Sequence, residues 1–136
     1  MDRLKVLFLC TGNSCRSQMA EGWLRHLGGD RYEAFSAGTA PKPVHPLAVR
    51  AMREVGVDIS GQQSKSVAGF AGVPLDAVVT VCDRARESCP ASAGHTATLH
   101  WSFDDPAQAT GTEEERMQVF RRVRDEIASR VRDFAR

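Results

Sequence analysis

The sequence predicts an α/β protein, a three-layer sandwich in which helices flank a four-stranded parallel sheet. Two observations predict this fold class. Short apolar segments alternate with helical patterns along the whole chain, and the first of these segments is apolar on both faces, as strands of a parallel sheet are. Strands separated by helices pair in parallel through right-handed crossovers. The 136 residues suit a single domain, residues 1–136, with no repeat or linker.

The N-terminal half contains two predicted strands and two predicted helices. The strands cover residues 4–9 and 32–37. The first helix ends at Gly28 and Gly29, and the second begins at Pro46 and ends at Gly56. Their predicted apolar faces consist of Met19, Ala20, Trp23, Leu24 and Leu27 in the first helix, and of Leu47, Ala48, Ala51, Met52 and Val55 in the second.

The C-terminal half contains the remaining two strands and the clearest helix. Residues 58–74 have no period, which predicts a loop with one short helical turn. The β-branched residues 77–81 predict a strand, and residues 96–101 a weaker fourth one. Thr112 and Glu115 form the pattern of a capping box at the start of the last helix. The apolar stripe of that helix comprises Met117, Phe120, Val123, Ile127, Val131 and Phe134.

Composition excludes several classes of protein. Lysine and arginine number 18 and aspartate and glutamate 17, a net charge of +1, which argues against a nucleic-acid binder and against an acidic disordered chain. No apolar run approaches the ~20 residues of a membrane span, and Val6–Leu9 is too short for the core of a signal peptide. We therefore expect a cytosolic monomer without nucleic-acid or membrane partners. In a reducing cytosol, cysteines are more often catalytic, redox-active or metal-binding than disulfide-bonded.

The segment from Cys10 to Ser17 joins the first strand to the first helix. Ligands of parallel sheets bind at the carboxyl ends of strands, and helix N-termini bind anions. Gly12 and Asn13 tolerate positive φ, which lets backbone N–H groups converge on an anion. Arg16 adds a fork of donors suited to a tetrahedral oxyanion, and these groups together favour the thiolate form of Cys10. The alternative is a buried cysteine before an ordinary turn, but the Cys-x5-Arg-Ser order at a strand-to-helix junction favours the functional interpretation. We expect Cys15 to be a packing residue.

A second cysteine pair, Cys82 and Cys89, follows the strand of residues 77–81. Cys82 therefore lies at the same edge of the sheet as Cys10. If residues 82–89 are helical, the Cα atoms of this pair lie about 10 Å apart, beyond the roughly 4.4–6.8 Å of a disulfide, so bridging requires unwinding. Two unrelated buried thiols are one alternative. A zinc site is another, but the cysteine spacings do not match its usual ligand spacing and the four histidines are scattered.

The loop and its surroundings resemble a known family. Cys10–Ser17, continued by Gln18-Met19-Ala20-Glu21-Gly22, resembles the phosphate-binding loop of the low-molecular-weight tyrosine phosphatase fold, and most closely that of the thioredoxin-coupled arsenate reductases. The resemblance extends over nearly the whole chain. It continues through Ser36-Ala37-Gly38, His45-Pro46, Gly56-Val57-Asp58-Ile59-Ser60, the Cys82–Cys89 segment and Asp104-Asp105-Pro106.

The resemblance implies reduction of arsenate to arsenite by a relay of three thiols. Cys10 would form an adduct with arsenic, Cys82 would attack Cys10 and release arsenite, and Cys89 would attack Cys82. The resulting disulfide would be reduced by a thioredoxin-like protein. Phosphate or sulfate would compete with arsenate, and no cofactor or metal is expected. The implied site consists of Cys10, Arg16, Ser17, Cys82, Cys89 and Asp105 as catalytic residues, and of Thr11, Gly12, Asn13, Ser14, Cys15 and Arg16 as the oxyanion cradle.

Individual residues within the resemblance have alternatives. Asp105 matches the proton donor of the phosphatases, or it belongs to an ordinary turn. Some members of the family bind potassium through residues matching Asn13, Glu21 and Ser36, but Lys65 stands where an acidic residue is expected. The Lys65 ammonium is therefore expected to pair with Glu21, and potassium dependence is not expected.

Two other functions compete with arsenate reduction. One is a protein or small-molecule phosphatase, and the other is a redox or arsenic sensor that keeps the loop for binding only. A phosphatase needs neither Cys82 nor Cys89. The sequence also lacks an aromatic pair before Asp105 that would grip a phenyl ring, although the orientation of Trp101 and Phe103 is not predicted. An inorganic oxyanion therefore fits better as the substrate.

Overall fold

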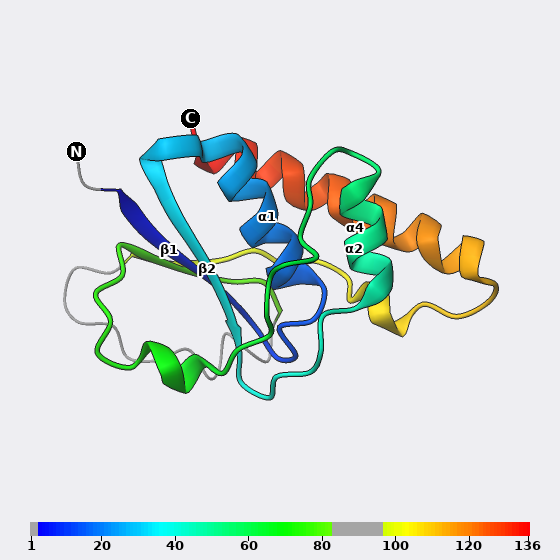
Figure 1. Cartoon of the computed structure of the whole chain (residues 1–136), viewed down its shortest axis with the longest axis horizontal. Helices are drawn as coiled ribbons and strands as arrows, with labels where there is room; N and C mark the ends of the chain where they lie inside the picture. The colour runs from blue at the N-terminus through cyan, green and yellow to red at the C-terminus, as the bar shows by residue number, and fades with distance from the viewer. Residues whose placement is uncertain (1–2, 83–96) are drawn as a thin grey trace.

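A four-stranded parallel sheet forms the centre of the molecule (Figure 1). The computed structural model describes residues 3–82 and 97–136. The strands are β1 (Leu4–Cys10), β2 (Tyr32–Gly38), β3 (Ala77–Thr80) and β4 (Ala97–His100), in the order β2-β1-β3-β4. Every pair of neighbouring strands is parallel. The predicted fold class, an α/β protein with a four-stranded parallel sheet, is confirmed.

The register of the strands aligns their carboxyl ends. Strands β1 and β2 pair residue for residue, from Leu4 opposite Tyr32 to Cys10 opposite Gly38. Leu9 of β1 lies opposite Thr80, the last residue of β3. Because the strands are parallel, Cys10 and the residues that follow β3 meet at one edge of the sheet.

Three helices gather on one side of the sheet (Figure 1). They are α1 (Arg16–Gly28), α2 (Pro46–Arg53) and α4 (Glu113–Phe134). Arg124 of α4 holds them together, because its carbonyl accepts from the Trp23 indole at 3.1 Å and its guanidinium donates to the Ala51 carbonyl at 2.9 Å. The short 3-10 helices are η1 (Gly29–Arg31), η2 (Val67–Phe70) and η3 (Pro106–Gln108).

Most predicted elements agree with the structure within a few residues at their ends. The loop of residues 58–74 contains the single helical turn η2, whose Phe70 ring packs 5.6 Å from that of Phe35. The capping box is present: the Thr112 hydroxyl accepts from the amide of Glu115, and the Glu115 carboxylate accepts from the amide of Thr112, both at 3.1 Å. The stripe of α4 is buried apart from Phe134, which is half-buried.

One predicted core residue is wrong. Val55 is 36% exposed and lies beyond α2, which ends at Arg53. The amide of Val57 donates back to the Met52 carbonyl at 3.0 Å, and Gly56 adopts a φ of 80° to close that turn. The turn directs Val55 outward, whereas a continued helix would have kept it on the apolar face.

None of the helices that the structure describes combines the length and the apolar character that crossing a membrane requires.

Candidate active site

The thiol of Cys10 lies at the end of β1, where the chain turns into α1. The residue is buried, and its Sγ accepts from the amide of Asn13 at 3.1 Å. The Ser17 hydroxyl lies 2.8 Å from the same sulfur. The Asn13 amide and the Ser17 hydroxyl, both from the start of the helix, therefore converge on a single sulfur atom.

The conformation of the loop depends on Asn13. This buried residue has a φ of 47°, in the left-handed region that asparagine tolerates better than most residues. Its side chain donates to the Ser17 hydroxyl at 2.8 Å and accepts from the amide of Lys65 at 2.8 Å. Of the two residues that tolerate positive φ, Asn13 adopts it and Gly12 does not. One residue in the left-handed region, anchored by the hydrogen bonds of its side-chain amide, is sufficient for the turn.

The segment that follows β2 braces the loop from outside. Four of its backbone amides donate to carbonyl groups of the loop, at 2.8–3.2 Å. Thr39 donates to Cys10, Ala40 to Thr11, Lys42 to Gly12 and His45 to Ser14. The carbonyls of the loop are thereby turned away from the cavity. Within the described chain, the amides of Gly12, Ser14 and Cys15 have no protein acceptor and remain available to an anion.

Gly38 permits this bracing. A Cβ atom at position 38 would lie 2.5 Å from the Thr11 carbonyl oxygen and 2.9 Å from the Asn13 amide nitrogen. Both are backbone atoms that cannot move aside without distorting the loop. A side chain of any size is therefore excluded here, and glycine is required by close approach rather than by its φ.

Arg16 and Asp105 form an ion pair at the cavity. The Arg16 guanidinium donates to the Phe103 carbonyl at 3.2 Å and lies 3.6 Å from the Asp105 carboxylate. Asp105 also accepts from the amide of Ala107 at 3.0 Å, which fixes it at the start of η3. These contacts hold the guanidinium over the loop and place a carboxyl group beside it.

A cavity of about 350 Å³ opens above the loop. Among the described residues that line it, none is aromatic. Trp101 instead lies in the core, where its ring packs 6.0 Å from Phe8 and 5.8 Å from Phe134. The cavity therefore suits a small polar anion better than a phenyl ring. Its lining consists of Cys10, Thr11, Gly12, Ser14, Cys15, Arg16, Lys42, Cys82, Asp105, Ala107 and Gln108.

Cys82 lines the same cavity as Cys10. It is a free, buried thiol whose Sγ lies 3.4 Å from the Thr11 hydroxyl. The predicted meeting of these two cysteines at one edge of the sheet thus agrees with the structure. Cys89, and the predicted helix of residues 82–89 beyond Cys82, lie outside the described residues.

Cys15 is a buried thiol whose surroundings disfavour its charged form. Burial raises its pKa to about 12, against a smaller lowering effect of the Ser14 hydroxyl. The thiol therefore stays protonated at neutral pH and is a poor nucleophile. This agrees with the packing role expected for it, although its backbone contributes to the cradle.

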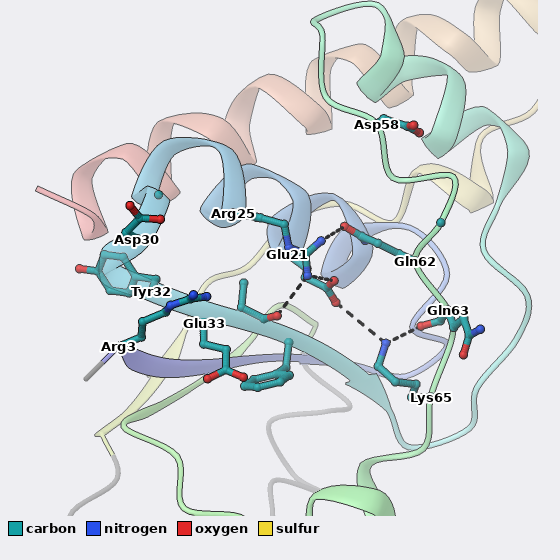
Figure 2. Close-up of a pocket in the computed structure, with 14 residues that line it drawn as sticks. Arg3, Glu21, Arg25, Asp30, Tyr32, Glu33, Asp58, Gln62, Gln63 and Lys65 are labelled. Atoms are coloured by element: carbon teal, nitrogen blue, oxygen red, sulfur yellow. Dashed lines mark hydrogen bonds and ion pairs between the residues drawn. The ribbon is translucent and has the colours of Figure 1, made fainter. Parts of the chain in front are cut away.

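The buried Glu21 and the half-buried Lys65 form a polar cluster (Figure 2). The Glu21 side chain is only 5% exposed and accepts from the Ser36 hydroxyl and from Arg25, each at 2.7 Å. The Lys65 ammonium lies 4.0 Å from the Glu21 carboxylate, so the expected ion pair is confirmed. This cluster lines a separate open pocket of about 770 Å³. Within residues 3–82 and 97–136, no three His, Cys, Asp or Glu side chains are grouped as a metal site.

Sequence reasoning missed the residues that act on the loop from the chain after β2. Lys42 lines the cavity, and His45 connects the loop to α2. The His45 Nδ1 accepts from the amide of Leu47 at 3.1 Å, and its ring lies 4.9 Å from that of Phe120. Burial, followed by the nearby Arg116, lowers the pKa of His45, which keeps the neutral imidazole able to accept this bond. Lys42 and His45 are distant from the loop in the sequence, so no local pattern indicates that they lie beside it.

The fold and the loop together define a class of protein in which a cysteine at a strand end lies beneath a phosphate-binding turn. The family model for low molecular weight phosphotyrosine protein phosphatase matches residues 5–136, and the chain belongs to this family. An arsenate reductase of Halalkalibacterium halodurans is 50% identical over 99% of this chain and 97% of its own length.

Two solved structures show the same likeness in three dimensions. A structure described as an arsenate reductase in the phosphate binding state has a TM-score of 0.79 and 34% identity, and the match covers 97% of this chain and 96% of that one. A thioredoxin-dependent arsenate reductase of Corynebacterium glutamicum has a TM-score of 0.78 and 28% identity over 97% of this chain and 60% of that one.

Proposed function

We propose that this protein is an arsenate reductase that converts arsenate to arsenite with protein thiols as the source of electrons. The single observation that carries the proposal is the free thiol of Cys82, which lines the same cavity as Cys10 in addition to the packing residue Cys15. A phosphatase of this fold has no use for a second thiol there. The name shared by the relatives at about 50% identity supports the same reaction.

The first step forms a bond between sulfur and arsenic. The Cys10 thiolate attacks the arsenic of bound arsenate, and one oxygen leaves as water. Asp105 lies beside Arg16 and is placed to supply the proton for that oxygen. Arg16 and the free amides of the loop hold the remaining oxygens, and the Ser17 hydroxyl stabilises the thiolate before attack.

The second step transfers the electrons. Cys82 attacks the Sγ of Cys10, the sulfur–arsenic bond breaks, and its electron pair stays on arsenic, which leaves as arsenite. The products are a Cys10–Cys82 disulfide and reduced arsenic, so two thiols have supplied two electrons. Cys89 then attacks Cys82, which releases Cys10 and forms the Cys82–Cys89 disulfide.

The cycle closes with an external dithiol. We propose a thioredoxin-like protein as the reductant, because one structural relative is described as thioredoxin-dependent. We also propose that residues 1–136 act as one domain and as a monomer in the cytosol, where thiols remain reduced. Phosphate and sulfate are expected to compete with arsenate, since both are tetrahedral oxyanions.

Turnover with arsenate tests the proposal directly. Thioredoxin, thioredoxin reductase and NADPH are supplied, and NADPH consumption is compared with the arsenite released. One arsenite per NADPH is expected, and the Cys10→Ser variant should be inactive. If the protein hydrolyses aryl phosphates rapidly but consumes no NADPH with arsenate, it is a phosphatase. If it binds arsenate but does neither, it is a sensor.

The Cys82→Ser variant separates the two reactions on one scaffold. Because arsenate and phosphate are similar in shape and charge, slow hydrolysis of an aryl phosphate should survive in Cys82→Ser and vanish in Cys10→Ser. Equal loss in both variants would mean that Cys82 shapes the loop and does not act after Cys10.

A further inference from the structure

Without Lys42, the charged side chains that line the cavity do not favour an incoming anion, because they are one arginine and one aspartate. Arg16 is the only cation within the loop, and it already lies 3.6 Å from the Asp105 carboxylate and donates to the Phe103 carbonyl. The nucleophile beneath it reacts as a thiolate and repels an oxyanion. A second cation at the cavity would add to the attraction that the free loop amides and Arg16 offer a dianion.

Lys42 supplies a cation at this position. It lines the cavity but belongs to the segment after β2, not to the loop. Its amide donates to the Gly12 carbonyl at 2.8 Å. The Cγ and Cδ atoms of its side chain lie 3.9–4.0 Å from where a Cβ of Gly12 would be. The stem of the lysine therefore lies against Gly12, and the residue as a whole is exposed to solvent.

The backbone on either side holds Lys42 in place. Pro41 and Pro43 flank it and restrict φ at both positions. The Ser14 hydroxyl donates to the Pro43 carbonyl at 3.0 Å, and the amide of Ala40 donates to the Thr11 carbonyl at 2.8 Å. The segment is thus fastened to the loop before, at and after Lys42.

The charge of Lys42 is not neutralised by the part of the chain that the structure describes. No carboxylate in residues 3–82 or 97–136 forms an ion pair with it, in contrast to Arg16, Arg25 and Lys65. A lysine ammonium is a point charge on a flexible stem, so it can follow an anion from the rim to the loop without a fixed geometry.

We propose that Lys42 is a further oxyanion-binding residue of this site, which captures arsenate and favours its dianion. The proposal rests on the proposed function, because it concerns the substrate of the same cavity. It also gives the cavity a preference for substrate over product, since arsenous acid is uncharged at neutral pH and gains nothing from the ammonium. Lys42 therefore acts on substrate binding rather than on electron transfer.

Three variants of the full chain test the role of Lys42. Lys42→Met keeps the stem and removes the charge, and Lys42→Arg keeps the charge. Lys5→Met is the matched control, because it changes the net charge equally but lies at the opposite end of β1, roughly 17 Å from Cys10. Steady-state rates with arsenate are measured at several salt concentrations, and inhibition by inorganic phosphate and by sulfate is measured alongside.

Lys42→Met is expected to raise KM for arsenate about fivefold with kcat within twofold of the original, the scale of one solvent-exposed charge contact. Phosphate and sulfate should inhibit it more weakly by a similar factor, and kcat/KM should depend less on salt. Lys42→Arg and Lys5→Met should resemble the unsubstituted protein. Unchanged KM in Lys42→Met, or an equal change in Lys5→Met, would overturn the proposal. Absence of turnover in the unsubstituted protein would instead contradict the proposed function.

Discussion

The Ser17 hydroxyl contacts both the side-chain amide of Asn13 and the sulfur of Cys10. The Nδ2 of Asn13 donates to the Ser17 oxygen at 2.8 Å, so the hydrogen of Ser17 is free to point to the Cys10 sulfur, 2.8 Å away. When Cys10 is a thiolate it carries no hydrogen, so in that state Ser17 donates and the sulfur accepts. A thiolate is a better acceptor than a thiol, which makes this pair of contacts a device for keeping Cys10 reactive.

Loss of the Ser17 hydroxyl should therefore slow reactions of Cys10. We expect Ser17→Ala to lower the rate of Cys10 alkylation by iodoacetamide at neutral pH about tenfold, because one hydrogen bond to a charged sulfur is lost. Ser60→Ala is the control, since the Ser60 hydroxyl bonds to the exposed Asp58 and to no other side chain in the described part of the chain. Mass spectrometry after timed quenching measures the rate. Equal alkylation rates in the two variants would contradict the assigned role of Ser17.

Gly38 should tolerate no side chain. Gly38→Ala places a Cβ against two backbone atoms of the loop, so we expect a loss of roughly 2 kcal/mol in the free energy of unfolding and weaker binding of inorganic phosphate. Gly61→Ala is the matched control, because a Cβ there meets no atom within 4 Å. Urea denaturation and calorimetric titration provide the two readouts. A Gly38→Ala variant with the stability and phosphate affinity of Gly61→Ala would show that the loop can shift at little cost.

In the proposed thiol relay, Cys89 takes part only in the last step, in which it attacks Cys82 of the Cys10–Cys82 disulfide. The Cys89→Ser variant should accordingly release one arsenite per enzyme and then stop, because the Cys10–Cys82 disulfide has no resolving thiol. Rapid-quench measurement of arsenite gives the stoichiometry. Repeated turnover of this variant with thioredoxin would contradict the relay. Cys15→Ala is the matched variant and should continue to turn over, since a thiol with a pKa of about 12 takes no part as a nucleophile at neutral pH.

Potassium should not stimulate the enzyme. The Lys65 ammonium lies 4.0 Å from the buried Glu21 carboxylate and repels a metal cation from it. We expect the same kcat/KM in potassium chloride and in sodium chloride at equal ionic strength. Lys65→Met is the comparison variant, because it removes the repelling charge and leaves the Ser36 and Arg25 contacts of Glu21 in place. Selective activation of the unsubstituted protein by potassium would disprove this account.

The contact between α2 and α4 should weaken in acid. Hydrogen bonds and ion pairs from Arg121 and Arg124 lower the pKa of Glu54 to about 2, from an ordinary value of 4.5. Because the pKa of Glu54 is lower in the folded than in the unfolded protein, the carboxylate stabilises the fold at pH values above the unfolded pKa of 4.5. This contribution to the free energy of unfolding is lost as the pH falls from 4.5 through about 2. Urea midpoints of Glu54→Gln should therefore lie below those of the unsubstituted protein at pH 6 and converge with them near pH 2. Glu33→Gln removes no ion pair in the described chain, so its urea midpoint should not change relative to the unsubstituted protein between pH 6 and pH 2. A constant offset for Glu54→Gln across this range would contradict the interpretation.

The sequence by itself determined the elements whose signals are local. A strand such as Leu4–Cys10 is defined by an apolar run, and the start of α4 by Thr112 and Glu115, which bond to each other three residues apart. The loop of Cys10–Ser17 is local too, since nucleophile, turn and arginine follow one another directly. Patterns of this kind survive without knowledge of the rest of the chain, because the interacting groups are neighbours along it.

Only the tertiary structure decided which distant residues complete the site. The segment that carries Lys42 reaches the loop because β1 and β2 pair in register and bring Gly38 against Cys10. Trp101 faces the core because Phe8 and Phe134 pack against it. The sequence already predicts Cys82 at the edge of the sheet that carries Cys10, but the contact of Cys82 with the Thr11 hydroxyl depends on the pairing of β3 with β1. These contacts join residues far apart in the chain, and their geometry follows from strand register and packing. Strand register and packing produce no periodic pattern in the sequence around these residues, because each contact depends on residues of another strand or helix.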